Sequence, residues 1–345
     1  MEPEPKMRIC MYATLPDHDN FLTFLKQYDI LDVALSSTSH PEHRTRFSPE
    51  AADKPGAFWD FQTLLWARTQ CEDAGLNLVS IENPLPNWCY EKIVLGQDGR
   101  DQQIENVAET IRNMGRAGIP VYGYHWMVNQ PGVTRNSWRT SLTTPGRGNS
   151  QVSRFERDVA DRGPLFRDRE YSHEEMWSNY EYFIKAIIPV AEEAGVRLAL
   201  HPDDPPVEKL GGIPRLFCNP AGFQRAMDIA GSPASGLNFC LGNWTAMNVD
   251  IHAAIRRFGS RGQIVYGHVQ GVQGAVPDFR ECFLEEADCD FLAIFKTFRE
   301  VGFSGALIPG HFPHTIYDDK SPHHGLLYSA GYVKGLLRSL DAGRS

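Results

Sequence analysis

The sequence contains no run of about 18 apolar residues, the length that a transmembrane helix needs. Its first five residues lack the basic and apolar regions of a secretory signal peptide. Its seven cysteines are widely spaced and include no Cys-x-x-Cys pair, and their odd number favours a reducing compartment over a disulfide framework. We therefore expect a cytoplasmic protein without a membrane partner.

The sequence also has no polybasic tail, because its lysines and arginines are interspersed with acidic residues. The formal net charge is −9 and the pI is about 5.7. This balance argues against nucleic acid as a partner. An anionic substrate stays compatible with it, since a pocket can be locally basic in an acidic protein.

What the sequence does contain is a regular alternation of short apolar runs and helical patterns over its 345 residues, about one pair per 43 residues. Such alternation predicts a parallel sheet covered by helices, and eight units favour a closed (β/α)8 TIM barrel. Because no linker or composition break interrupts the chain, we expect one domain over residues 1–345. The expected strands are 8–14, 30–35, 77–81, 120–126, 196–200, 235–239, 263–267 and 305–308; the expected helices are 20–28, 59–74, 104–117, 173–193, 220–230, 250–258, 291–301 and 328–340.

One long polar excursion, at about residues 127–172, interrupts this alternation after the fourth strand. We expect an insertion without regular structure, which in a compact domain is more often a lid or binding loop than padding. Arginine suits the bidentate capture of a carboxylate. The alternative is a solvated loop whose arginines pair with its own acidic residues. The arginines are Arg135, Arg139, Arg147 and Arg154.

Metal-binding side chains stand at the ends of four consecutive predicted strands. His201 opens a His-Pro-Asp-Asp-Pro-Pro turn directly after strand 196–200, and Cys240, His268 and His311 follow the next three strands. In a barrel these ends surround one opening, so the four residues predict a divalent-metal site, which Mn, Zn, Fe, Co or Ni would fit. Taken singly, a cysteine or histidine here is also compatible with a buried core residue, and the turn with a turn alone.

Two further polar residues reach the same predicted opening. Glu82 ends the third strand and His125 lies near the end of the fourth. Both are candidates for proton transfer, although Glu82 is equally compatible with a structural pair to an arginine.

Together these residues resemble the mannonate dehydratase family within the xylose-isomerase-like TIM barrels. The resemblance covers about residues 195–340 well and the first half more loosely, where Trp138-Arg139 and Ser153-Arg154-Phe155 look like parts of a substrate loop. The matching segments are His201-Pro-Asp-Asp-Pro-Pro, Gly-Ile-Pro-Arg215, Asn238-Phe-Cys240-Leu-Gly, Gly267-His268, Phe279-Arg-Glu281, Ala287-Asp288-Cys-Asp290, His314 with Asp318-Asp319, Tyr328-Ser-Ala and Lys334-Gly-Leu.

The resemblance implies dehydration of D-mannonate to 2-keto-3-deoxygluconate with Mn²⁺ or a similar divalent ion. It implies His201, Cys240 and His268 as metal ligands and Tyr328 as an acid or base. The family's fourth ligand is an Asp followed directly by a catalytic His. In residues 308–312, Ile-Pro-Gly-His-Phe, one alignment places His311 at the ligand and Phe312 at the catalytic His; a shift by one residue makes His311 the catalytic His and Gly310 the ligand position.

The predicted function is a metal-dependent sugar-acid dehydratase. Two alternatives stay open: a metal-dependent isomerase, epimerase or β-eliminating lyase of the same superfamily, and a sugar-acid-binding protein without turnover. Fold-level analogy adds a homo-oligomer. We assign the metal to His201, Cys240, His268 and His311, catalysis to Tyr328, His125 and Glu82, and substrate binding to Arg139, Arg154, Asp203, His314 and Asp319.

Overall fold

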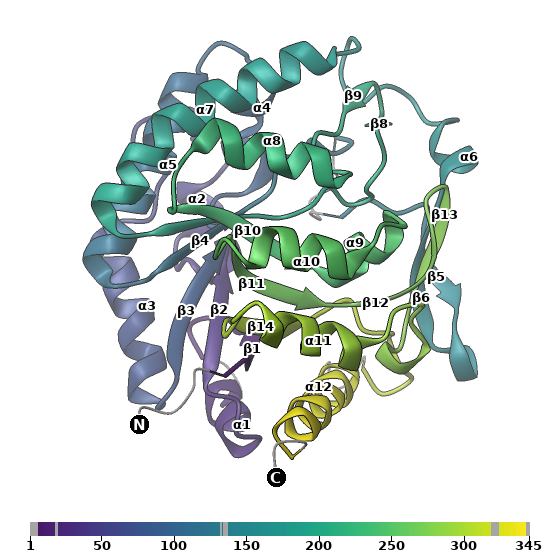
Figure 1. The fold of residues 1–345 in the computed structure, drawn as a ribbon. Coiled ribbons are helices and arrows are strands. Elements are labelled where there is room, and N and C mark those ends of the chain that lie inside the picture. Colours follow the sequence, from purple (N-terminus) through teal and green to yellow (C-terminus); the bar gives the residue numbers. More distant parts are fainter. Residues whose placement is uncertain (1–5, 18–19, 132, 134–136, 319–323, 343–345) are drawn as a thin grey trace.

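The computed structural model describes residues 6–17, 20–131, 133, 137–318 and 324–342. Eight parallel strands close into a barrel in the order β1-β14-β11-β10-β7-β4-β3-β2 (Figure 1). This confirms the predicted TIM barrel. The barrel strands are β1 (Arg8–Tyr12), β2 (Asp32–Ser36), β3 (Asn77–Glu82), β4 (Val121–Tyr124), β7 (Arg197–Leu200), β10 (Ser235–Cys240), β11 (Ile264–Val269) and β14 (Ala306–Pro309).

Helices surround the barrel, and eight of them lie where the helical patterns predicted them. These are α1 (Phe21–Gln27), α3 (Phe61–Asp73), α5 (Arg100–Ala117), α7 (His173–Ala194), α8 (Pro220–Ala230), α10 (Ile251–Gly259), α11 (Phe291–Glu300) and α12 (His324–Ala342). Short helices α2 (His43–Arg46), α4 (Glu91–Leu95), α6 (Arg157–Ala160) and α9 (Leu241–Ala246) were not predicted, because four to six residues carry too little periodicity. Among the described residues, no helix is long and apolar enough to cross a bilayer.

The helix α7 shows how local sequence fixes these boundaries. The Ser172 hydroxyl accepts the amide of Glu175 at 3.2 Å, and the Glu175 carboxylate accepts the amide of Ser172 at 2.7 Å. This reciprocal capping satisfies donors that the first helical turn leaves unpaired. The helix stops at Gly195, whose φ of 67° suits a residue without a Cβ.

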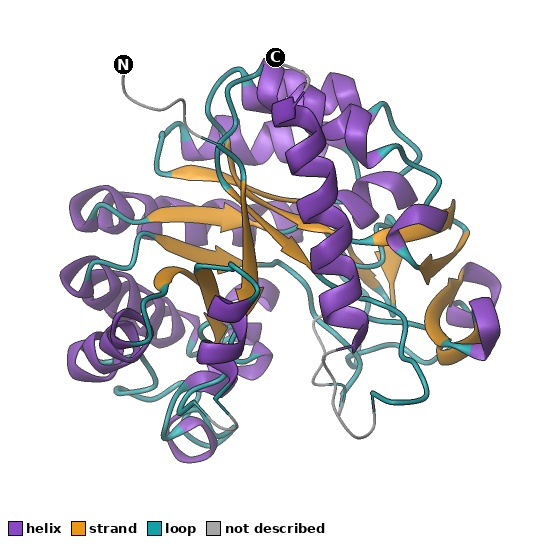
Figure 2. Cartoon of the chain, turned by 90° about the horizontal axis from the view of Figure 1, so that it is seen from below, coloured by secondary structure: helices purple, strands orange, loops and turns teal. Residues whose placement is uncertain are grey.

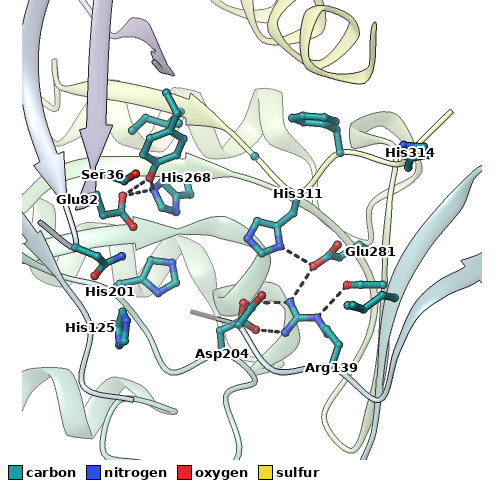
Figure 3. A pocket seen from close by; sticks show the side chains of 18 of the residues that line it. Ser36, Glu82, His125, Arg139, His201, Asp204, His268, Glu281, His311 and His314 are labelled. Carbon is teal, nitrogen blue, oxygen red and sulfur yellow. Dashed lines mark hydrogen bonds and ion pairs between the residues drawn. The ribbon is translucent and has the colours of Figure 1, made fainter. Parts of the chain in front are cut away.

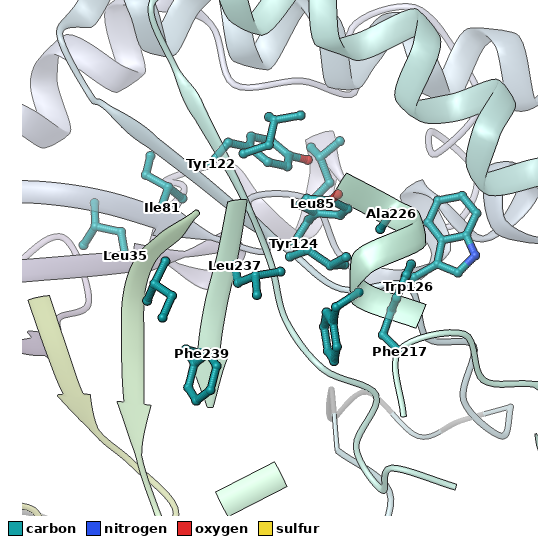
Figure 4. Packing of buried hydrophobic residues seen from close by; sticks show 14 of the residues in the cluster. Leu35, Ile81, Leu85, Tyr122, Tyr124, Trp126, Phe217, Ala226, Leu237 and Phe239 are labelled. Atoms are coloured by element: carbon teal, nitrogen blue, oxygen red, sulfur yellow. The ribbon is translucent and has the colours of Figure 1, made fainter. Parts of the chain in front are cut away.

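The core lies between the strands and the helices that cover them. All six residues of β10 are buried, and Figure 4 shows Leu237 and Phe239 of this strand among the core residues. Phe239 stacks on Trp244 of α9 with ring centroids 4.5 Å apart. Burial of a side chain of this size contributes about 1.5–3 kcal/mol. The packed barrel therefore gives a rigid base for the loops at its carboxyl end.

A second, antiparallel sheet stands beside the carboxyl ends of the barrel strands (Figures 1 and 2). Two hairpins form it in the order β12-β13-β6-β5. They are β5 (Ser141–Pro145) with β6 (Gln151–Glu156), and β12 (Gly271–Ala275) with β13 (Asp278–Cys282). The expectation of an insertion without regular structure is therefore wrong for 141–156. Its polar strands form because β6 pairs with β13, a partner that local periodicity does not reveal. We call residues 137–156 the arm. A smaller two-stranded sheet pairs β8 (Lys209–Leu210) with β9 (Ile213–Pro214).

Candidate active site at the carboxyl ends of the strands

A cavity of about 630 Å³ opens at the carboxyl ends of the barrel strands, between the barrel and the arm (Figure 3). In a parallel barrel the loops after the strands converge at this end, so side chains far apart in sequence meet there. The polar residues around it come from the ends of nearly every strand and from the arm. They include Tyr12, Ser36, Glu82, His125, Arg139, Ser153, His201, Asp204, His268, Glu281, His311 and His314.

Three of the four predicted metal ligands come together. The ligand atoms of His201, Cys240 and His268 all lie within 4.8 Å of one another. Strand register explains this, since Cys240 and His268 are direct partners on β10 and β11, and His201 follows β7 on the other side of β10. Two imidazoles and a thiolate form a donor set typical of divalent transition metals.

The His201 ring is held in the form that a metal needs. Its Nδ1 donates to the carbonyl oxygen of Pro202 at 2.7 Å. The neutral ring then keeps a lone pair on Nε2. Burial, reinforced by the nearby His268, lowers the pKa of His201 to about 4, so the ring is neutral at physiological pH.

Glu82 orients the His268 ring through a hydrogen bond to its Nε2. His268 Nε2 lies 2.9 Å from a Glu82 carboxylate oxygen, which also accepts hydrogen bonds from the hydroxyls of Tyr12 and Tyr266. Burial alone would raise the pKa of Glu82, but the charge and hydrogen bond of His268 outweigh it, and the pKa falls to about 2. Because Nε2 of His268 is hydrogen-bonded to this ionised carboxylate, Nδ1 is the ring nitrogen that can coordinate a metal ion.

Cys240 is buried at the start of α9. Its sulfur lies 2.9 Å from the amide oxygen of Asn243 and 3.3 Å from that of Gln270. Burial raises the pKa of the thiol above its ordinary value, so a bound cation would be needed to displace the proton. Each of the seven cysteines, all of which the structure describes, is free of disulfides.

His311 lies at the same cavity but outside this group of three. Its Nδ1 is 2.7 Å from Glu281 Oε1, and 38% of its side chain is exposed. Burial works to lower the pKa of His311, but the charge and hydrogen bond of Glu281 outweigh it and raise the pKa. Its φ of 52° is a left-handed backbone conformation that few residues other than glycine adopt. The fold thus holds this ring in a specific place.

Arg139 also reaches the cavity, where Figure 3 shows it between Asp204 and Glu281. Its side chain is 1% exposed and forms ion pairs with both carboxylates. These partners raise its pKa against the effect of burial.

His125 and His314 line the cavity as well. The hydroxyl of Tyr90 lies 2.5 Å from His125 Nε2, which fixes that buried ring. The backbone of His314 exchanges two hydrogen bonds with Gln151 of β6, at 2.9 and 2.8 Å. The segment after β14 is therefore paired to the arm.

Other predicted residues lie elsewhere. Arg154 pairs with Asp278 at 2.6 Å on the outer side of the arm, and Tyr328 is 47% exposed and donates to Glu285 at 2.6 Å. Neither is among the described residues that line the cavity. Their roles, like those of the other assigned residues, stay predictions. Asp319, and Arg135 of the predicted lid, lie outside the residues that the structure describes.

Asp203 is also absent from the described lining of the cavity. It is buried, and one carboxylate oxygen accepts the amide of Phe217 at 2.6 Å while the other faces Arg215 at 3.5 Å. Burial raises the pKa of Asp203 to about 6, although Arg215 opposes this. These contacts describe a residue that fixes the loop after β7.

Several residues of the site were not predicted, among them Tyr12, Asp204 and Glu281. Tyr12 ends β1, but the first strand was predicted to run to residue 14, so its predicted end is Thr14 and not Tyr12. Asp204 and Glu281 stand within the segments of the family resemblance, but no signal in the sequence shows that both contact Arg139.

The closed parallel barrel places this protein in the xylose-isomerase-like TIM-barrel fold class. A xylose isomerase domain protein of Planctomyces limnophilus has the same fold, with a TM-score of 0.60 at 14% identity, covering 99% of this chain and all of that one. The chain belongs to the D-mannonate dehydratase (UxuA) family, whose model matches residues 48–166 and 162–345. It is accordingly a carbon–oxygen lyase of the hydro-lyase type.

Individual relatives agree with this family. Mannonate dehydratase 2 of Halalkalibacterium halodurans is 30% identical over 318 residues, which cover 83% of this chain and 89% of that protein. The mannonate dehydratase of Streptococcus equi subsp. zooepidemicus is 33% identical over 316 residues, covering 82% and 84%. The crystal structure of mannonate dehydratase from Streptococcus suis serotype 2 has a TM-score of 0.83 at 28% identity, covering 98% of this chain and 95% of that one.

Proposed function

We propose that the protein dehydrates D-mannonate to 2-keto-3-deoxy-D-gluconate with a divalent metal, Mn²⁺ first among the ions considered. The proposal rests on the group of His201, Cys240 and His268, which could bind a metal ion beside the cavity. His311 lies outside this group, is hydrogen-bonded to Glu281 and lines the same cavity. Family membership supplies the substrate, because the curated relatives are named mannonate dehydratases.

The three donors fit a metal ion. His201 offers Nε2, His268 offers Nδ1, and Cys240 offers a buried sulfur. When bound, a divalent ion supplies a Lewis acid that stabilises negative charge on the substrate carboxylate and orients the neighbouring hydroxyl. Glu82 maintains the orientation of His268 through their hydrogen bond. Because the pKa of Glu82 is low, this role suits it better than that of a base that accepts a proton from the substrate.

Dehydration needs a base and an acid from the chain itself. The base takes the proton from the carbon next to the carboxylate, and the acid gives a proton to the hydroxyl that leaves the following carbon as water. The resulting enol rearranges to the 2-keto acid. We assign these transfers first to His311, whose Nε2 is left for the cavity. His125 is the second group, because its ring lines the same cavity, where the Tyr90 hydroxyl and the Met127 amide contact its two nitrogens.

The test is metal content and turnover of D-mannonate by protein reconstituted with Mn²⁺. Cys240→Ala is expected to lose the metal and the activity, whereas His311→Ala is expected to keep the metal and lose the activity. Cys289→Ala is the matched control, because this cysteine lies outside the metal group and is only partly buried.

Each other outcome has a definite meaning. Metal binding without a 2-keto-3-deoxy product would exclude D-mannonate as the substrate. The alternatives would then be an isomerase, an epimerase, a β-eliminating lyase or a sugar-acid-binding protein. Loss of metal in His311→Ala would make His311 a ligand, as first assigned. No bound metal under any condition would reject the site. We also propose that the native metal is manganese, that the protein is cytoplasmic and that it forms a homo-oligomer.

A further inference from the structure

Arg139 has no hydrogen-bond donor left for a substrate. Its guanidinium carries five N–H groups, and every one has an acceptor in the protein. Nε donates to Ser153 at 3.0 Å, and Nη1 donates to the carbonyl of Trp138 at 3.1 Å and to Asp204 at 2.5 Å. Nη2 donates to the second oxygen of Asp204 at 3.1 Å and to Glu281 at 2.9 Å.

The charges around Arg139 give the same result. One buried cation is shared by two buried carboxylates, Asp204 and Glu281. A substrate carboxylate placed on Arg139 would have to displace Asp204 or Glu281 and take away the cation that faces this buried carboxylate, which is unfavourable. The predicted role of Arg139 as the carboxylate-binding residue therefore conflicts with its surroundings.

The contact with Asp204 joins the arm to a loop of the barrel. Arg139 and Ser153 belong to the arm, whereas Asp204 lies in the turn after β7 and Glu281 on β13. The amide of Trp138 also donates to the carbonyl of Asp204 at 3.1 Å. The first strand of the arm is thus fastened at its base to the loop that begins with His201.

Glu281 connects the same contacts to His311. Its Oε1 accepts from Arg139 at 2.9 Å and from Gln270 at 3.1 Å, and it lies 2.7 Å from His311 Nδ1. Since Nδ1 faces the carboxylate, Nε2 is the ring nitrogen left for the cavity. Gln270 in turn lies 3.3 Å from the sulfur of Cys240. One carboxylate oxygen therefore fixes the arm arginine and the His311 ring together.

We propose that Arg139 and Glu281 are positioning residues, Arg139 for the docked arm and Glu281 for the His311 ring, and that neither binds the substrate carboxylate. Arg139 fastens the arm to the turn after β7 through Asp204 and to β13 of the neighbouring hairpin through Glu281. Glu281 also sets the orientation of the His311 ring. The proposal rests on the proposed function only in treating His311 as a reacting group; docking of the arm does not depend on it.

The first test is amide hydrogen exchange of the arm in full-length, metal-loaded protein without substrate. In Arg139→Gln, exchange over 137–156 is expected to rise about tenfold or more, because the arm loses its fastening. Ser153→Ala, a milder change that removes one acceptor, is expected to raise exchange less. Arg157→Gln is the control: this arginine follows the arm directly and pairs with Asp161 in a partly exposed i,i+4 contact.

The second test separates Glu281 from the arm. Glu281→Gln keeps the shape of the side chain, and Asp204 still holds Arg139, so exchange of the arm is expected to stay near the unmodified level. Turnover of D-mannonate is expected to fall about 100-fold in kcat with little change in KM, because the His311 ring is no longer fixed. Nitrogen-15 NMR of the His311 ring should show a changed Nδ1 signal in this variant.

The outcomes distinguish this proposal from the alternatives. A large rise in KM for D-mannonate in Arg139→Gln, with unchanged arm exchange, would make Arg139 a substrate ligand and overturn the proposal. Unchanged kcat and an unchanged His311 signal in Glu281→Gln would remove the role of Glu281. If no variant turns over D-mannonate, the proposed function fails, while exchange and NMR still decide the positioning roles. If Arg139→Gln does not fold, Asp204→Asn, which removes the charge that pairs with Arg139 outside the arm, decides the docking role: unchanged arm exchange in that variant rejects it.

Discussion

At the scale of single residues, Gly123 shows how tightly the wall of the site is built. A Cβ on this β4 residue would lie 2.4 Å from the Tyr266 hydroxyl and 3.0 Å from Cγ of Glu82. That hydroxyl donates to Glu82 at 2.9 Å, so it cannot move without breaking the support of His268. The backbone of Gly123 has no positive φ that would require glycine, so the residue is needed because a Cβ would collide with these side chains.

We therefore expect Gly123→Ala to lower the free energy of unfolding by about 1–3 kcal/mol and to weaken metal binding. Chemical denaturation and metal titration would measure the two effects. Gly335→Ala in α12 is the control, because a Cβ there meets open space; it should stabilise the protein by about 0.5–1 kcal/mol. Equal behaviour of the two variants would contradict this account of the wall.

His40 makes a second residue-scale prediction, on pH. It packs edge-on against Phe47 and Trp59, with ring centroids 5.0 and 4.7 Å away. Burial, helped by the charge of Arg46, lowers the pKa of His40 from 6.5 to about 4. The unfolded chain therefore binds the proton more readily than the folded one, so stability falls as the pH drops from 6.5 towards 4 and is fully present above 6.5.

The contribution of this one group is at most about 3 kcal/mol at neutral pH. Unfolding free energies measured between pH 4 and 8 should show a smaller acid-side loss in His40→Gln than in the unmodified protein. Parallel pH profiles for the two proteins would show that His40 does not titrate in this way.

At the scale of elements, prediction from sequence succeeded where the signal was local. Each barrel strand is a short apolar run, and the residue that follows it, such as His201, is placed by that run alone. The arm hairpin was missed because β6 pairs with β13, where Glu156 faces Asp278, and this pairing joins segments more than a hundred residues apart. For the same reason the contacts of Arg139 with Glu281 could not be foreseen.

Capping of α7 gives a prediction at this scale. Ser172→Ala removes the acceptor of the Glu175 amide and should lower the free energy of unfolding by about 1 kcal/mol. Metal content and arm exchange should not change, because the cap is exposed and lies outside the cavity-lining residues that the structure describes. A Ser172→Asp variant, which restores an acceptor, should recover most of the loss; failure to recover would point to another cause.

At the scale of the whole molecule, the barrel and the metal group make stability depend on metal. A metal that binds only the folded chain adds about 2.7 kcal/mol at a hundred times its Kd. Thermal unfolding should therefore shift downward after chelation and recover on addition of Mn²⁺. Cys240→Ala should lack this shift, and a shift of normal size in that variant would place the metal elsewhere.

Sequence reasoning therefore reached the closed barrel and three residues that meet in one group, His201, Cys240 and His268. It did not reach the side-chain conformations that place His311 on Glu281 and Tyr328 on Glu285. The order of the barrel strands follows from their order along the chain, whereas the partner of a loop side chain depends on how separate loops meet.

The shared sheet of β5, β6, β13 and β12 has a consequence for protein engineering. If a segment from a relative replaced 137–156 alone, its second strand would carry side chains suited to the β13 of that relative. The β13 strand of this protein would then lose the partner with which it pairs here. Substrate preference should therefore be transplanted between members of the family only when both hairpins, 141–156 and 271–282, are exchanged as one unit.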